Sequence, residues 1–226
     1  MKRMKKLVIF LFLMVMAVAV VGCSKSKKKS NSDSSSDNKK TEKKAANFVL
    51  DSDNTFTIIY EEDFEEDYYD KDELESMIDS EINEFNTNYA KASSSGMSKK
   101  ELLVENGKAK LGLQFIDCQD YVEYERNYVD SNRNARLFIG KYETGISQGY
   151  KAVGRFTDLS GNKIDDIEDI AKAEGTYVLF TNQVFNMTIQ GEVIAFNGTV
   201  EYDSKSGLVI TSDKKENYII YKIKNE

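Results

Sequence analysis

The sequence predicts an α+β fold in which a mostly antiparallel sheet is packed by one long amphipathic helix and two shorter ones. The strands are predicted by segments from Thr176 onward in which Thr, Val, Ile, Tyr and Phe alternate with polar residues. Such alternation is typical of antiparallel strands with one face in water. The long helix is predicted from Asp70, where a capping pair precedes apolar residues at spacings of three and four.

The long helix has a start signal and an expected buried face. Asp70 and Glu73 form the capping pair, in which the two side chains satisfy backbone N–H groups of the first turn. The side of the helix expected to pack on the sheet holds Leu74, Met77, Ile78, Ile82, Phe85 and Tyr89. The other side is acidic, so we expect it to face water.

The strands are expected between turn signals rich in Gly, Asn, Asp and Ser. Asn106-Gly107 is the clearest of these signals, because this pair favours the two-residue turn of a β-hairpin. The predicted strands cover residues 47–50, 56–60, 102–104, 111–115, 135–139, 153–156, 162–164, 177–180, 185–189, 192–196, 199–202, 208–211 and 218–223.

The two shorter helices also carry capping residues. Asp117 is expected to cap the first of them. Asp165 with Glu168 is expected to cap the second, which Gly175 closes. Residues 144–150 are expected to form either a single helical turn or a loop.

The N-terminal residues are typical of a targeting segment. Four basic residues precede Leu7–Val21, a run of 15 uncharged and almost wholly apolar residues. A signal peptide has such a basic start and a run of this length, whereas a membrane-spanning helix needs about 20 apolar residues. A signal peptide over residues 1–22 is therefore expected, with an uncleaved membrane anchor as the alternative.

The run ends in Val20-Val21-Gly22-Cys23, which resembles the lipobox of bacterial lipoproteins. The resemblance implies cleavage between Gly22 and Cys23, and a diacylglycerol carrying acyl chains such as palmitate on the Cys23 thiol. It also implies that the protein is lipid-anchored at the extracytoplasmic face of the bacterial cell membrane. The two acyl chains of the diacylglycerol suffice for stable anchoring, whereas one chain alone binds a membrane only marginally.

Residues 23–46 are expected to form the lipidated cysteine and a flexible stalk. After Cys23 the segment is rich in Ser and Lys and has no aromatic residue and no aliphatic residue larger than Ala. Such a composition buries too little surface to offset the entropy cost of ordering the chain. Its lysines either contact anionic headgroups or wall polymers, or are simply solvated.

The predicted extracytoplasmic domain covers residues 47–226, with two halves dividing near residue 150 as an alternative. Residues 1–46 hold 12 of the 31 Lys and Arg residues and 3 of the 38 Asp and Glu residues. The domain therefore carries 19 basic and 35 acidic residues, a formal charge of −16. Because such a domain repels phosphate backbones, we expect no nucleic-acid partner.

The sequence contains no histidine. This absence excludes Ser-His-Asp and Cys-His nucleophile activation and every metal site that needs an imidazole. With Cys23 lipidated, Cys118 is the one remaining thiol. We expect no cofactor. The chemistry still open to an enzyme is a pair of carboxylates, as in glycoside hydrolysis.

Two sets of residues are candidates for binding. The acidic run at 61–72 offers Asp63, Asp67, Asp70 and Asp72 as metal ligands, although its spacing matches no calcium loop and a solvated acidic surface is favoured. Tyrosines are the other set, because their rings line many peptide and glycan grooves. Tyr68, Tyr69, Tyr121 and Tyr124 are candidates for such a groove, and packing in the core is the favoured alternative.

The chain also resembles the uncharacterised lipoprotein domains of clostridial gut bacteria. The resemblance lies in the lipobox, the Ser/Lys stalk, the acidic helix from Tyr69 and the closing strand from Tyr218. It implies a Gram-positive host and brings no activity. The tether, the antiparallel sheet and the missing catalytic residues predict a non-catalytic binding or envelope-associated module, which binds an extracellular ligand or protein. The alternative is a carboxylate-based hydrolase that acts on surface glycans.

Overall fold

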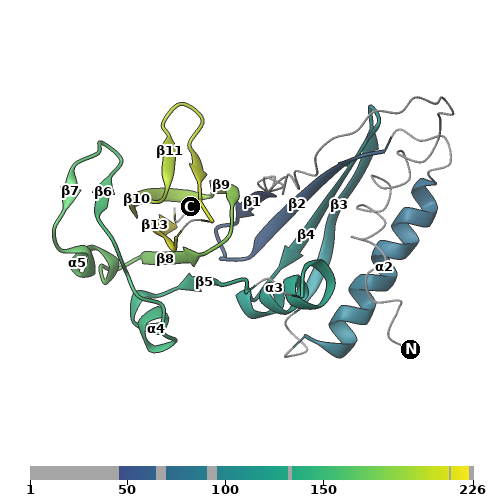
Figure 1. The fold of residues 1–226 in the computed structure, drawn as a ribbon, viewed down its shortest axis with the longest axis horizontal. Coiled ribbons are helices and arrows are strands. Elements are labelled where there is room, and N and C mark those ends of the chain that lie inside the picture. Colours follow the sequence, from purple (N-terminus) through teal and green to yellow (C-terminus); the bar gives the residue numbers. More distant parts are fainter. Residues whose placement is uncertain (1–45, 65–69, 91–95, 132–133, 214, 224–226) are drawn as a thin grey trace, which may run out of the picture.

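The computed structural model describes residues 46–64, 70–90, 96–131, 134–213 and 215–223. These residues form a mixed fold of helices and antiparallel-rich sheets, as predicted. The strands divide into two sheets, however, where the sequence predicted one (Figure 1). No helix in the described part of the chain is both long and apolar enough to cross a membrane.

The first sheet has seven strands in the order β11-β12-β9-β1-β2-β4-β3. Its strands are β1 (Ala46–Leu50), β2 (Phe56–Asp63), β3 (Met97–Glu105), β4 (Lys108–Phe115), β9 (Phe185–Ile189), β11 (Glu201–Asp203) and β12 (Leu208–Ile210). Neighbouring strands are antiparallel except β1 and β9, which run parallel with Ala46 opposite Phe185. This sheet therefore combines strands from both sides of residue 150.

The second sheet has six antiparallel strands in the order β5-β8-β13-β10-β6-β7. Its strands are β5 (Leu137–Gly140), β6 (Phe156–Asp158), β7 (Lys163–Ile164), β8 (Thr176–Thr181), β10 (Gly191–Asn197) and β13 (Asn217–Ile223). The chain changes sheet five times, after β4, β8, β9, β10 and β12. At the change from β9 to β10, a Cβ on Gly191 would lie 2.5 Å from the Lys222 carbonyl oxygen, so this crossing needs glycine.

Local turn signals predicted the hairpins correctly. Asn106 and Gly107 join β3 to β4 with φ angles of 52° and 71°, the left-handed conformations that a tight hairpin turn requires. All six predicted C-terminal strands are present. The largest difference is at β11, which begins at Glu201 and not at Thr199.

The long helix is α2 (Lys71–Asn88), and its predicted cap is confirmed. Asp70 Oδ1 accepts hydrogen bonds from the backbone N–H groups of Asp72 and Glu73, at 2.8 and 3.0 Å. Of the six residues expected on its apolar face, Leu74, Ile78 and Phe85 are buried. Met77, Ile82 and Tyr89 are half-buried and pack against the same core. The helix contacts the first sheet through its edge strand β3.

The shorter helices are α3 (Cys118–Tyr124), α4 (Tyr142–Ser147) and α5 (Ile167–Ala171). Asp117 caps α3 as predicted, accepting from the Gln119 N–H at 2.6 Å, and a π-helical turn over Glu125–Val129 continues this helix. The predicted cap of α5 was one residue off. Asp166 is the capping residue, because it directly precedes the first helical residue and its Oδ1 accepts from the Glu168 N–H at 3.1 Å. The Asp165 carboxylate pairs with Lys163 instead.

The core consists of two clusters of buried side chains. The first is rich in aromatic residues and receives side chains from both sheets, among them Phe48, Phe115, Leu179 and Tyr221. The second includes Phe138, Tyr150, Phe156, Phe180 and Tyr218 and is packed against by Ile167 and Ile170 of α5. The second sheet is therefore apolar on both faces, and its open ends are the places where polar side chains gather.

Candidate functional site

Several residues singled out by sequence lie outside the described residues. They are the cleavage and lipidation residues Gly22 and Cys23, the metal candidate Asp67, and the groove candidates Tyr68 and Tyr69. Their assignments stay predictions.

The remaining metal candidates are not assembled into a site. Asp63 is exposed at the end of β2, and Asp70 and Asp72 are exposed at the start of α2. Asp70 already accepts two backbone hydrogen bonds as the helix cap. Within the described residues, no group of three or more Asp, Glu or Cys side chains is placed to hold a metal ion.

Tyr121 and Tyr124 are core residues, not groove residues. Each is 1% exposed, because α3 turns both side chains toward the interior. The Tyr121 ring packs edge-on against Phe56 and Phe115, with centroids 6.0 and 5.6 Å away. The Tyr124 hydroxyl donates to Glu81 Oε1 at 2.8 Å. Burial, followed by the Glu81 charge, raises the pKa of Tyr124 well above its usual value.

The carboxyl groups with clearly shifted pKa values act as fixed turn and ion-pair partners. Hydrogen bonds, first of all from Thr55, Asn162 and Ser206, lower the pKa of Asp53, Asp158 and Asp203 respectively. Hydrogen bonds from lysines likewise lower the pKa of Asp165 and Glu168. A general acid in glycoside hydrolysis needs the opposite shift, so these five groups do not support the hydrolase alternative.

Among the described residues two carboxylates are buried, Asp120 at 0% and Glu125 at 2% exposed. Asp120 Oδ2 accepts a hydrogen bond of 2.6 Å from the backbone N–H of Gly96, while Oδ1 has no partner among the described residues. Asp120 therefore anchors the chain just before β3 begins.

A surface pocket of about 330 Å³ lies beside the first described residue. It is open and is formed by the start of β1, the second half of β2 and one residue of β9. Its lining residues are Ala46, Asn47, Ile59, Tyr60, Glu61, Glu62 and Asn186. Ala46 is also the last residue of the predicted stalk.

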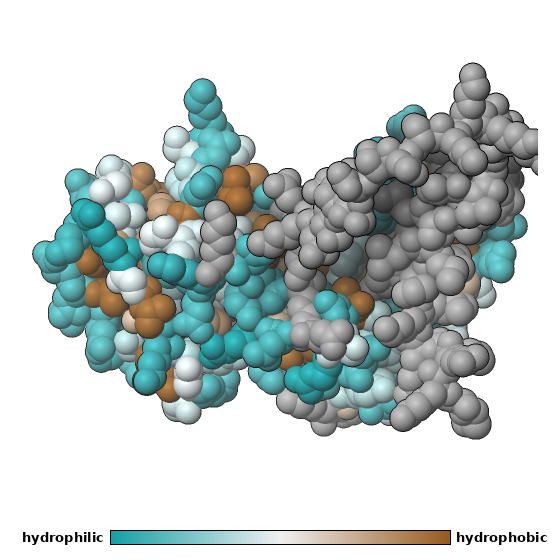
Figure 2. Space-filling view, in the orientation of Figure 1, coloured by the Kyte–Doolittle hydropathy of each residue, from teal (hydrophilic) through white to brown (hydrophobic). Residues whose placement is uncertain are grey.

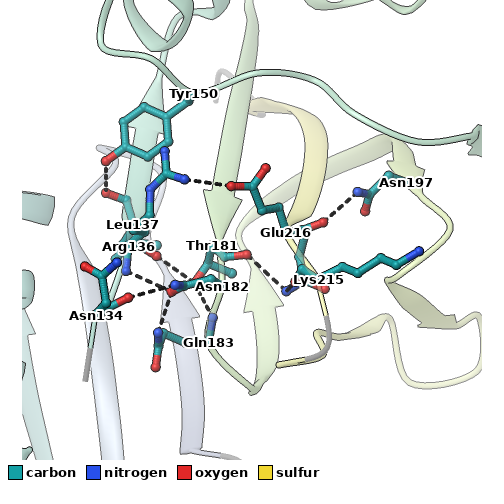
Figure 3. Close-up of polar contacts among 11 residues, drawn as sticks. Asn134, Arg136, Leu137, Tyr150, Thr181, Asn182, Gln183, Asn197, Lys215 and Glu216 are labelled. Atoms are coloured by element: carbon teal, nitrogen blue, oxygen red, sulfur yellow. Dashed lines mark hydrogen bonds and ion pairs between the residues drawn. The ribbon is translucent and has the colours of Figure 1, made fainter. Parts of the chain in front are cut away.

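A polar network at one end of the second sheet is the most ordered candidate site (Figure 3). It is built around Arg136, directly before β5. The Arg136 backbone N–H donates to Asn182 Oδ1 at 2.8 Å, and its carbonyl oxygen accepts from Thr181 Oγ1 at 3.1 Å. Asn182 Nδ2 donates to the Asn134 carbonyl at 2.8 Å, and Gln183 Nε2 donates to Asn182 Oδ1. The backbone of Arg136 is thus held on both sides.

The Arg136 guanidinium is held as firmly as its backbone. Its central carbon lies 4.9 Å from the Tyr150 ring centroid and 4.7 Å from that of Phe180, and the two centroids are 4.8 Å apart. The cation therefore lies over both rings, in the angle between them. Arg136 Nη1 also donates to Glu216 Oε1 at 2.6 Å. Burial raises the pKa of Tyr150, and the Arg136 charge opposes this shift.

Glu216 is fixed from the opposite side. Its carbonyl oxygen accepts hydrogen bonds from Asn197 Nδ2 at 2.8 Å and Thr199 Oγ1 at 3.0 Å. The next residue, Asn217, is fully buried and donates to the Thr181 and Ser212 carbonyls. Both members of the Arg136–Glu216 pair are thus positioned before any ligand arrives.

The sequence analysis missed this site. Arg136 and Glu216 are 80 residues apart, and no spacing motif connects them. One signal was present: Arg is rare in this chain, with five residues against 26 Lys, and Arg is preferred over Lys where a planar, bidentate contact is needed.

No protein-family model, no curated protein and no solved structure matches this chain.

Proposed function

We propose that this chain is a lipoprotein anchored to the extracytoplasmic face of the membrane, whose domain is a non-catalytic binding module. The lipobox-like stretch ending in Cys23 supports the anchor, and the Ser/Lys stalk that follows it supports a domain held away from the lipid. A tethered domain of this kind binds a ligand or protein outside the cell.

The observation that carries the binding function is the state of Arg136. Rings, a carboxylate and backbone hydrogen bonds fix this side chain, yet it remains 33% exposed. A charged group that is already held in one geometry loses little entropy when a ligand binds. Besides the Glu216 carboxylate, the side chains that surround it are amides, a hydroxyl and aromatic rings, which suit recognition more than proton transfer.

The anchor is tested by replacing each cysteine in a bacterial host that processes lipoproteins. Cys23→Ser should abolish incorporation of labelled palmitate and release the protein from the membrane fraction. Cys118→Ala is the matched control, and it should leave both properties unchanged. Labelled, membrane-bound Cys23→Ser protein would contradict the proposal.

The absence of catalysis needs its own assay. The full-length protein in detergent should show no turnover on a panel of glycan, ester and peptide substrates. Turnover that survives repurification, and that disappears when an acidic residue is replaced, would refute the non-catalytic module and revive the hydrolase alternative.

A further inference from the structure

The Arg136–Glu216 pair has hydrogen-bonding capacity left over. Glu216 accepts the Nη1 hydrogen bond through Oε1. No hydrogen bond from the described residues reaches Arg136 Nε or Nη2, or Glu216 Oε2. The two side chains are 33% and 37% exposed, so a small molecule can approach these atoms from solvent.

The atoms without a hydrogen bond to another described residue, Arg136 Nε and Nη2 and Glu216 Oε2, indicate the charge of the ligand. The free guanidinium edge fits a carboxylate, to which it can donate two parallel hydrogen bonds. The free Glu216 oxygen fits an ammonium group. Because the pair itself is neutral and the domain has a formal charge of −16, a polyanion such as a phosphate ester is repelled.

An exposed apolar residue is joined to this pair through the backbone. Asn197 Nδ2 donates to the Val153 carbonyl at 3.2 Å as well as to the Glu216 carbonyl at 2.8 Å. One amide group therefore connects the two segments, and the Val153 residue is 44% exposed. On the face of the molecule that Figure 2 shows, apolar groups lie in small separate areas among hydrophilic ones. Val153 is a single exposed apolar residue joined to Glu216 through Asn197.

From these features we infer that the Arg136–Glu216 pair binds a zwitterionic α-amino acid with an uncharged side chain. The ligand carboxylate bonds to the free edge of Arg136, its ammonium bonds to Glu216 Oε2, and its side chain lies toward Val153. This inference rests on the proposed binding function and names its ligand class.

The inference is tested with three matched probes on the full-length protein in detergent. They are L-leucine, L-leucinamide, which lacks the carboxylate, and 4-methylpentanoate, which lacks the ammonium. The melting temperature measured against probe concentration gives an apparent Kd for each. Leucine should bind at least about tenfold more tightly than either analogue. Leucinamide loses the charge-assisted hydrogen bonds from Arg136 to the carboxylate, and 4-methylpentanoate loses the one from the ammonium to Glu216.

Variants separate recognition from packing. Arg136→Lys keeps the charge but removes the planar fork, and should weaken leucine binding at least about tenfold. Glu216→Gln should reverse the preference, so that 4-methylpentanoate binds more tightly than leucine, because the arginine charge is no longer neutralised. Lys172→Gln is the matched control: Lys172 also pairs with a glutamate and lies over a ring, 5.5 Å from Tyr142, and its loss should not change binding.

Equal apparent affinities for the three probes, or no binding of leucine, would overturn the inference. So would a Glu216→Gln protein that still prefers leucine. These results would not refute the proposed function, because that proposal is tested by the palmitate and turnover assays and not by amino-acid binding.

Discussion

Asn217 provides the sharpest test of how the fold is held together at the change from β12 to β13. Its side chain is fully buried and makes four hydrogen bonds to the backbone. Nδ2 donates to the carbonyls of Thr181, Ser212 and Lys215, and Oδ1 accepts from the Ser212 N–H at 3.0 Å. The Lys215 contact, at 3.4 Å, is the weakest of the four.

Asn217→Ala removes all four hydrogen bonds and leaves their backbone partners behind. Each buried backbone group left without a partner costs about 1–3 kcal/mol. The Thr181 carbonyl lies in the buried end of β8, whereas Ser212 and Lys215 lie in a more exposed loop where water can replace the lost bond. One group at the full cost and three near zero give a loss of about 1–3 kcal/mol in the free energy of unfolding.

Urea denaturation of the full-length protein in detergent, followed by circular dichroism, measures this loss. Asn162→Ala is the matched control, because Asn162 is exposed and its amide donates to the Asp158 carboxylate at a turn. We expect the control to lose less than about 1 kcal/mol, the usual range for a surface change. A loss below about 1 kcal/mol for Asn217→Ala would refute the conclusion that this amide holds the crossing.

Three further predictions concern other parts of the fold. Gly191→Ala should cost about 1–3 kcal/mol in urea denaturation, because its Cβ would lie 2.5 Å from the Lys222 carbonyl; an unchanged midpoint would contradict this. Asp70→Ala should lower the free energy of unfolding by about 1 kcal/mol, because α2 loses its cap. An unchanged free energy of unfolding would contradict this. Burial raises the pKa values of Tyr124 and Tyr221 above the ordinary 10.0, so both stay neutral in the fold but ionise in the unfolded chain. Stability should therefore fall as pH rises above about 10, and absorbance at 295 nm should rise together with unfolding; tyrosinate forming fully in the folded protein would contradict this.

Local structure could be predicted from sequence wherever a few neighbouring residues decide it. The Asp70 cap and the Asn106-Gly107 turn were predicted correctly because each depends on backbone groups within four residues. The division into two sheets could not be predicted in this way. The parallel pairing of β1 with β9 joins Ala46 to Phe185, and nothing in either segment identifies its partner.

The candidate site was harder to predict than the fold. Tyr121 and Tyr124 have the same residue type as many groove residues, and only the direction in which α3 faces makes them core residues. The signal peptide, the lipidation of Cys23 and the clostridial resemblance stay predictions, since no described residue tests them.

The candidate site and the sheet crossings have a common physical origin. Among the described residues, nine polar side chains are buried, and five of them lie where strands end or the chain changes sheet: Thr181, Gln183, Asn197, Thr211 and Asn217. Where a strand leaves its sheet, some backbone N–H and C=O groups lose their partners in the neighbouring strand. Polar side chains must then supply the missing hydrogen bonds. Two of these residues, Thr181 and Asn197, bond to the backbones of Arg136 and Glu216 respectively.

This arrangement separates stability from recognition. The amides that hold the crossing bond to backbone carbonyls and are buried, whereas the Arg136 and Glu216 side chains are partly exposed and bond to each other. Exposed ion pairs contribute about 0–1 kcal/mol to stability. Glu216→Gln should therefore change ligand preference with a small effect on unfolding, and Asn217→Ala should do the reverse. If both variants lose the same stability, the Arg136–Glu216 pair is a structural part of the crossing and not a binding group.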